Sequence, residues 1–463
     1  MMKKLFFLAA AAIVALCAVR AQNPIIRTMY TADPAPLVHR DTLFVFVGHD
    51  EDDAPARTFL MREYRLFSTV DMVNWTDHGA ALRTGEIDWS VGDASAAQVI
   101  ERNGKFYYYV STQNNTPGAG GVSVGVLVAD NIRGPYRDPL GRALVTNQMT
   151  PQARHSWDDL DPTVFIDDDG HAYLFWGNNA CYWVRLGEDM ISLDGPIHAL
   201  DVRDESIFGP DFEEAPWVYK RGGTYYMIYA SGLPESIHYA TAPEPDGPWK
   251  YRGVVMPRQG GIGTNHPGVV DYRGRSYFFY HNDFLPGGHD HRRSVAVEEF
   301  AYNPDGTIPL MTMTEGVARS IAPLDPYRRV EAETMALSQG VKTAGGYGVD
   351  RGGNCVREEV CVTSIHDGDY IRVREVDFGA EGASTFTART SSRWFGGEIE
   401  LRLDTTDGPV IGTLRAPYTR EWENWSIDSA PVTGATGVHD LYFVFRGGAP
   451  HELLRFDHWS FSE

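Results

Sequence analysis

The feature that most constrains the fold of this sequence is a five-fold repeat of a turn followed by an aromatic strand. The turn residues, spaced 51 to 66 residues apart, are Asp41, Gly104, Gly170, Gly223 and Gly274. Each unit also has a short strand before the turn and a third strand after the aromatic one. Repeats of this length with three or four antiparallel strands are typical of propeller blades. The repeat therefore predicts an all-β chain that begins with a five-bladed β-propeller.

A second domain is indicated by a change of pattern after the proline-rich segment 321–326. Residues beyond it alternate in hydrophobicity with a period of two, which is typical of the strands of a β-sandwich. The 47 Gly and 27 Pro residues of the 463-residue chain suit many short strands joined by turns. We expect a propeller over 22–322, a linker over 323–326 and a jelly-roll sandwich over 327–463.

The first 21 residues have the pattern of a cleaved signal peptide. Two lysines precede an apolar run, and small residues suited to cleavage end at Ala21. Lipid attachment at Cys17 is the alternative, disfavoured because Leu16 is larger than the residue that usually precedes a lipidated cysteine. No later stretch approaches the ~20 apolar residues of a membrane span. We expect a secreted or periplasmic protein.

The formal net charge of −21 argues against nucleic acid and against an anionic membrane surface as partners, because both would repel the chain. A neutral polysaccharide is compatible with this charge. In an oxidising compartment the spacing of Cys355 and Cys361 permits a local disulfide.

Four residues occupy the same position in the repeat, eight or nine residues before a turn residue: Asp33, Asp161, Glu214 and His266. The innermost strands of a propeller line its axis, so residues at equivalent positions should converge there. Neighbouring carboxylates cannot all ionise without cost, and their pKa values separate into those of an acid and a base. Asp before Pro also commonly starts a strand after a turn, but three carboxylates at one position favour a site for glycoside cleavage.

Several segments resemble the signature segments of glycoside hydrolase family 43, and together they span roughly residues 28–320. They are 32–36, 161–170, 214–216, 264–267 and 292–297. The resemblance implies a five-bladed propeller of inverting enzymes that act on arabinose and xylose linkages. It implies that Asp33 is the general base, that Glu214 is the general acid, with Glu213 as the alternative, and that Asp161 tunes and orients the acid.

The same resemblance implies roles for three further positions. His266 matches a position that holds a hydrated ion, commonly calcium, although a histidine before proline is as readily a hydrogen-bonded core residue. Asn265 and Arg293 match substrate contacts, with Arg292 as an alternative to Arg293. Ser95 stands at the equivalent position of the second unit, where relatives often carry an aromatic residue, so the platform for the sugar is not identified.

Residues 327–463 resemble a family 6 carbohydrate-binding module. The matching segments are 330–333, 345–348, 368–370, 422–425 and 456–459. Glu331 and Glu333 alternate along a strand, so both can face one structural calcium ion together with Asp457. By the resemblance, Tyr347 and Trp422 would sandwich a sugar ring. Where the family usually has an asparagine this chain has Arg455, which puts the specificity of that cleft in question.

Together these observations predict an exported inverting hydrolase that removes α-L-arabinofuranosyl groups from arabinoxylan without an organic cofactor. A β-xylosidase, or another enzyme that cleaves xylan or arabinan, is the alternative with the same chemistry. The expected partner is a plant cell-wall polysaccharide in each case. A polysaccharide-binding protein without activity is the third reading, and three convergent carboxylates argue against it.

Overall fold

The computed structural model describes residues 23–150, 154–349, 355–448 and 450–463. The only helices in these ranges are the 3-10 turn Thr84–Glu86 and the single turn α1 (Glu205–Phe208), so the described chain is all-β, as predicted. None of its helices could cross a membrane. The predicted signal peptide lies outside the described residues.

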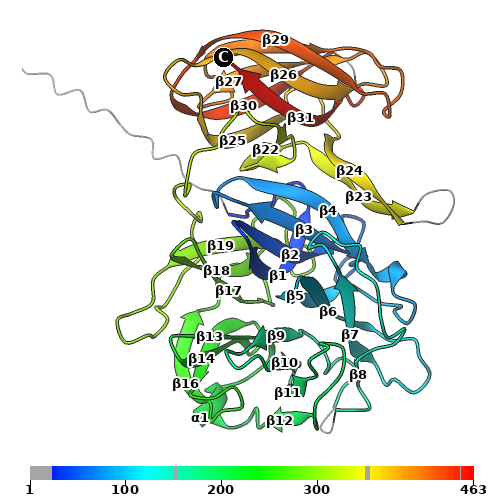
Figure 1. Cartoon of the computed structure of the whole chain (residues 1–463), viewed down its shortest axis with the longest axis vertical. Coiled ribbons are helices and arrows are strands. Elements are labelled where there is room, and N and C mark those ends of the chain that lie inside the picture. Colours follow the sequence, from blue (N-terminus) through cyan, green and yellow to red (C-terminus); the bar gives the residue numbers. More distant parts are fainter. Residues whose placement is uncertain (1–22, 151–153, 350–354, 449) are drawn as a thin grey trace, which may run out of the picture.

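Residues 30–300 form successive antiparallel sheets whose strands are neighbours in sequence order (Figure 1). The first group is β1 (Tyr30–His39), β2 (Thr42–Asp50), β3 (Glu63–Thr69) and β4 (Trp75–Arg83). The second is β5 (Ser95–Arg102), β6 (Lys105–Gln113), β7 (Val122–Ala129) and β8 (Val145–Thr146). The third is β9 (Thr163–Ile166), β10 (Ala172–Trp176), β11 (Cys181–Leu186) and β12 (His198–Leu200). The fourth is β13 (Glu214–Arg221), β14 (Thr224–Ser231), β15 (Ser236–Ala242) and β16 (Lys250–Met256), and the last is β17 (Gly268–Tyr272), β18 (Arg275–Asn282) and β19 (Ser294–Phe300).

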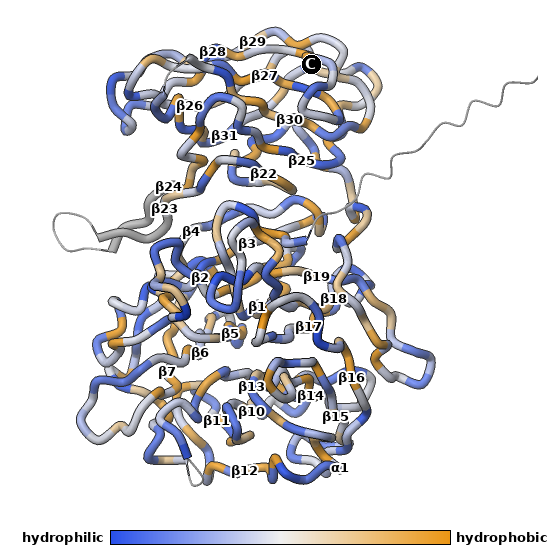
Figure 2. The backbone as a smooth tube through the Cα atoms, turned by 180° about the vertical axis from the view of Figure 1, so that it is seen from behind, coloured by the Kyte–Doolittle hydropathy of each residue, from blue (hydrophilic) through white to orange (hydrophobic). Residues whose placement is uncertain are grey.

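The predicted aromatic strands are the second strands of these sheets, and they are buried because neighbouring sheets cover both of their faces. Tyr108 of β6 packs against Phe46 and Tyr64 of the first sheet, with ring centroids 5.1 and 5.3 Å apart. Four of the predicted turn glycines have a φ between 74° and 85°, a backbone conformation that other residues rarely adopt. Figure 2 shows apolar and polar residues interleaved along the tube in both halves of the molecule.

The N-terminal segment closes the β-propeller by pairing with the last strand, β19. The amide of Ile25 donates to the carbonyl of Val295, and that of Thr31 donates to the carbonyl of Arg293, both at 2.9 Å. The side chain of Asn23 exchanges two hydrogen bonds with the backbone of Val297. The chain thus joins its first described residues to its last propeller sheet.

The C-terminal domain, residues 330–462, is a β-sandwich. One sheet has the order β22 (Leu337–Gln339), β25 (Tyr370–Asp377), β30 (Val438–Arg446), β27 (Gly397–Leu403) and β28 (Val410–Ala416). The other includes β20 (Val330–Glu331), β23 (Lys342–Val349), β24 (Cys355–Thr363), β31 (Arg455–Ser462), β26 (Ala383–Ser391) and β29 (Ser426–Ala435). Trp459, Phe443 and Phe386 fill the space between the sheets.

The two domains share a continuous sheet. The edge strand β4 pairs with β21 (Thr334–Met335) and, through Ala80, with β23 of the second domain. Asn74 and Arg374 exchange two buried hydrogen bonds, of 2.8 and 3.0 Å, between side chain and backbone. The predicted linker 323–326 is also packed, because Leu324 donates to the carbonyl of Glu375 and accepts from the amide of Asp377.

Candidate active site

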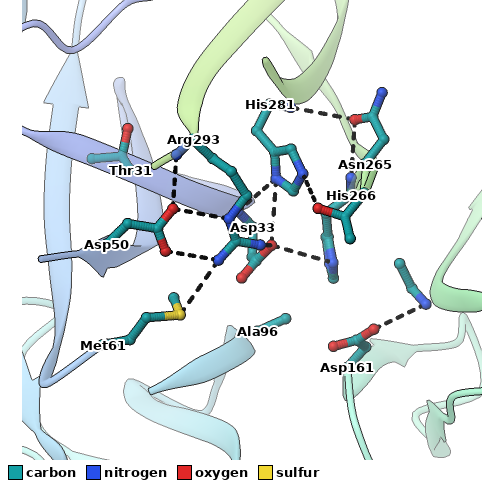
Figure 3. A network of polar contacts seen from close by, with 12 residues as sticks. Thr31, Asp33, Asp50, Met61, Ala96, Asp161, Asn265, His266, His281 and Arg293 are labelled. Atoms are coloured by element: carbon teal, nitrogen blue, oxygen red, sulfur yellow. Dashed lines mark hydrogen bonds and ion pairs between the residues drawn. The ribbon is translucent and has the colours of Figure 1, made fainter. Parts of the chain in front are cut away.

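The structure brings the four residues predicted from the repeat into one cavity of about 550 Å³. Asp33, Asp161, Glu214 and His266 all line it, together with Ser95 and Arg293. Figure 3 shows Asp33 and Arg293 at the centre of a polar network, with Asp161 at the lower right of the view. The convergence predicted from equivalent repeat positions is therefore present.

Local irregularities in the first strands of the sheets aim these carboxyl groups into the cavity. The pairing of β1 with β2 shifts register between Ala32 and Ala35, and that of β13 with β14 shifts between Glu214 and Trp217. Asp33 and Asp161 have positive φ angles of 55° and 61°, which cost about 1 kcal/mol or more for a residue with a side chain. Strained backbone of this kind is commonly found at functional sites.

Asp33 is held in its ionised form. Burial alone would raise the pKa of Asp33, but Arg293, whose Nη1 donates to Oδ1 at 2.9 Å, holds that pKa well below its usual range. Two more nitrogens of the same guanidinium donate to Asp50 at 2.9 Å. His281 lies 3.4 Å from Asp33 and also favours the ionised carboxylate. The arrangement suits a general base.

The other two carboxyl groups are pushed toward their protonated forms. Burial, reinforced by repulsion from Asp33 and Glu213, raises the pKa of Glu214. Burial, reinforced by repulsion from Glu214, raises the pKa of Asp161 well above its usual value. Asp161 also accepts a 3.1 Å hydrogen bond from the amide of Ala215, the residue next to Glu214. It is therefore placed to orient the strand that carries the acid.

The remaining predicted positions have mixed outcomes. Arg293 lines the cavity, whereas Arg292 does not and donates to the carbonyl of Asp52. Asn265 is not among the lining residues. Its side-chain oxygen accepts from the amides of His266 and His281, and its own amide donates to Glu235. A direct contact of Asn265 with substrate stays a prediction.

His266 sits beside the base, its Nδ1 3.9 Å from Oδ1 of Asp33. Burial lowers the pKa of His266 to about 4, so the imidazole is neutral at ordinary pH. A neutral imidazole has a free electron pair for a metal or a hydrated ion, and the predicted ion stays a prediction.

Glu213 also lines the cavity, where its Oε1 accepts from Asn179 at 3.0 Å.

Sequence reasoning missed several residues of the cavity. Asn178 donates to Glu214, and Glu235 lies against the same acid. Trp157, which is 49% exposed, stacks on His155 with ring centroids 4.7 Å apart, and it supplies an aromatic surface that Ser95 lacks. None of these residues occupies the repeated position that marked the others, so the repeat held no signal for them.

In the second domain, ligand atoms of Glu331, Asp457 and His458 lie within 4.8 Å of one another. It is the one such group found in the described part of the chain, and His458 was not predicted. Glu333 is buried near them with Oε2 lacking a hydrogen-bond partner, and burial raises its pKa well above the usual value. An unpaired buried carboxylate oxygen is a suitable ligand for a cation.

The predicted sugar cleft is described in part. Trp422 is half-buried, and the guanidinium of Arg455 covers its ring at 4.7 Å. The side chains of Tyr347 and Cys355 lie outside the described residues, while Cys361 is buried.

Comparison with known proteins agrees with both domains. Residues 21–308 match Glycosyl hydrolases family 43, and residues 331–463 match Carbohydrate binding module (family 6). An arabinoxylan arabinofuranohydrolase of Bacillus subtilis is 32% identical over 95% of this chain and 92% of its own length. Xylosidase/arabinosidase 43A of Humicola insolens is 29% identical over 62% of this chain and 98% of its own. The crystal structure of a glycoside hydrolase family 43 arabinoxylan arabinofuranohydrolase from B. subtilis, in complex with cellotetraose, aligns with a TM-score of 0.82 and 32% identity over 95% of this chain and 97% of that one.

Proposed function

The chain belongs to family 43 of the glycosyl hydrolases, and from this premise we propose that it removes α-L-arabinofuranosyl groups from arabinoxylan with inversion at the anomeric carbon. The observation that carries this proposal is the opposite environment of two carboxyl groups in one cavity. Asp33 is held ionised by Arg293, and Glu214 is pushed toward its protonated form. One protein group can therefore accept a proton while the other donates one.

In the proposed reaction, Glu214 gives its proton to the glycosidic oxygen as the bond to the anomeric carbon breaks. Asp33 takes a proton from the water that attacks the opposite face of the sugar. Asp161 stays protonated and, through the amide of Ala215, holds the backbone of the acid in place.

The rim of the cavity supports a polymeric substrate. Trp157 and Phe59 both line it and are 49% and 38% exposed, so part of each ring surface is open to sugar rings. The named activities of two relatives, an arabinoxylan arabinofuranohydrolase and a xylosidase/arabinosidase, support arabinose as the released sugar. We keep β-xylosidase activity as the alternative.

We further propose that the five successive sheets are five propeller blades and that residues 1–21 direct the protein to the periplasm or the exterior. Calcium, which prefers oxygen ligands, would bind at Glu331, Glu333 and Asp457. The unpaired Oε2 of Glu333 supports this site. His458 lies beside Glu331 and Asp457 in the same site.

Turnover of aryl α-L-arabinofuranoside, aryl β-xyloside and arabinoxylan tests the proposal. We expect the arabinofuranoside to be preferred and arabinose to be released from the polymer, with the inverted anomer seen by NMR of the fresh product. Preference for the xyloside would favour the alternative, and retention would contradict the assignment of Asp33 as base. Absence of turnover on all three would favour a binding protein.

A further inference from the structure

A further carboxyl group, that of Glu235, lies in the catalytic cavity. Glu235 precedes β15, is 4% exposed and is fixed from two directions. Its amide donates to the carbonyl of Gly263 at 2.8 Å, and its Oε2 accepts from the amide of Asn265. Its Oε1 is buried with no hydrogen-bond partner among the described residues, and a neighbouring acid lies beside the carboxyl group.

That neighbouring acid is Glu214, which begins β13 in the same sheet as β15 and lines the same cavity as Glu235, so that the two carboxyl groups interact. Ionised carboxylates only accept hydrogen bonds, so two of them can bond to each other only when at least one carries a proton. A hydrogen bond between these two groups therefore requires a shared proton.

The groups that face this pair would not neutralise two negative charges. Asp161 and Asp33 repel it, as does Glu213 on the Glu214 side, whereas Asn178 and the amide of Asn265 are neutral donors. The guanidinium of Arg293, which lines the same cavity, is bonded to Asp33 and Asp50. Both carboxyl groups of the pair can be ionised together only at considerable cost.

We propose that Glu235 is a positioning residue for the acid, sharing a proton with Glu214 so that Glu214 remains able to protonate the leaving group. This role rests on the proposed function of Glu214. Burial and repulsion from Glu214 raise the pKa of Glu235 well above its usual value, in agreement with the shared proton. After each turnover, the same contact offers a proton to the newly ionised Glu214.

Glu235→Gln tests the proposal because it removes the ionisable group and keeps an acceptor for the amide of Asn265. The amide side chain does not repel an ionised Glu214 and can donate to it, so both effects lower the pKa of Glu214. We expect the alkaline limb of the kcat/KM profile to move to lower pH by about one unit or more. Glu235→Asp keeps a carboxyl group, so the alkaline limb should move less in this variant than in Glu235→Gln.

Asp93→Asn is the matched control. Asp93 lines the same cavity and accepts from the amide of Met61 at 2.7 Å, a bond that asparagine can keep. The substitution Asp93→Asn removes one carboxyl group that does not contact Glu214, so the alkaline limb of kcat/KM should stay at the same pH. An unmoved limb in Glu235→Gln, or an equal movement in Asp93→Asn, would overturn the proposal.

A second measurement does not depend on activity. In protein labelled with 13C at glutamate carboxyl groups, NMR should show Glu235 titrating at a pH well above the ordinary range of glutamate. The midpoint of this titration should move to lower pH in Glu214→Gln. Ordinary titration, or no response to Glu214→Gln, would overturn the shared proton even if Glu235→Gln fails to fold. If the titrations of Glu214 and Glu235 are coupled, but Glu214→Gln slows turnover of substrates with good and poor leaving groups equally, the proposed function of Glu214 fails instead.

Discussion

Asp33 and Glu214 show how neighbouring residues give the same chemical group opposite environments. Arg293 touches one carboxyl group, and other acids surround the second. The sequence placed both residues at equivalent positions of the repeat but could not distinguish their environments, because Arg293 and Asp50 are distant in sequence from Asp33. The assignment of acid and base therefore required either the family resemblance or the structure.

The role of the acid predicts a dependence on the leaving group. Glu214→Gln keeps the shape of the side chain and removes the proton, so turnover of arabinoxylan should fall by ~10²–10⁴-fold. Aryl substrates with very acidic leaving groups need less protonation and should lose less. Kinetics on both substrate types checks this, and equal, small losses would exclude Glu214 and direct attention to Glu213.

The base can be tested through the arginine that supports it. Arg293→Lys keeps a positive charge but not the forked contact with Asp33 and Asp50, so the ionised form of Asp33 loses stabilisation and its pKa rises. The acidic limb of kcat/KM should therefore move to higher pH, by about one unit. Arg292→Lys, next in sequence but bonded to the carbonyl of Asp52 away from the cavity, is the control and should leave the limb unchanged.

At the scale of elements, the turn glycines and aromatic runs identified the second strand of each propeller sheet, since turn chemistry and burial are local properties. The pairing of the N-terminal segment with β19 could not be predicted in the same way. That pairing joins residues more than 250 positions apart and is made largely by the backbone, which has no sequence signature. The same holds for the pairing of β4 with β21 and β23.

The closure of the propeller predicts a large effect from one asparagine. Asn23→Ala removes the acceptor for the amide of Val297 and the donor to its carbonyl, and should lower the free energy of unfolding by about 1–3 kcal/mol in urea denaturation. Asn303→Ala, which removes only an exposed bond to Thr307 within a turn, should change it by less than about 0.5 kcal/mol. Similar small effects of both variants would argue against a closure through this segment.

At the scale of the whole molecule, the sequence identified two domains and their families but described their connection as a simple linker. The structure has β4 continuing into the second domain and the buried pair of Asn74 and Arg374. Strand edges and buried amides must be satisfied, so each domain completes part of the other.

The junction predicts what happens when the second domain is removed. A chain ending at Pro326 should melt several degrees below the full chain, because the edge of β4 and the side chain of Asn74 lose their partners. Below that temperature it should still cleave an aryl glycoside, since the cavity residues all precede the cut. Trp422→Ala in the full chain should keep the melting temperature and lower binding to insoluble xylan. Equal melting of truncated and full chains, measured by calorimetry, would contradict the structural role of the junction.

The shared sheet has a consequence for how the enzyme would work on a solid substrate. Modules joined by a flexible tether let an anchored catalytic domain sweep a volume set by the length of the tether. Here the anchor and the cavity are joined by paired strands, so the cavity stands at a fixed offset from the point of attachment. A bound molecule can reach only the side groups at that offset. It reaches new ones by dissociating and rebinding elsewhere, so weak and short-lived binding of the second domain would favour turnover more than tight binding.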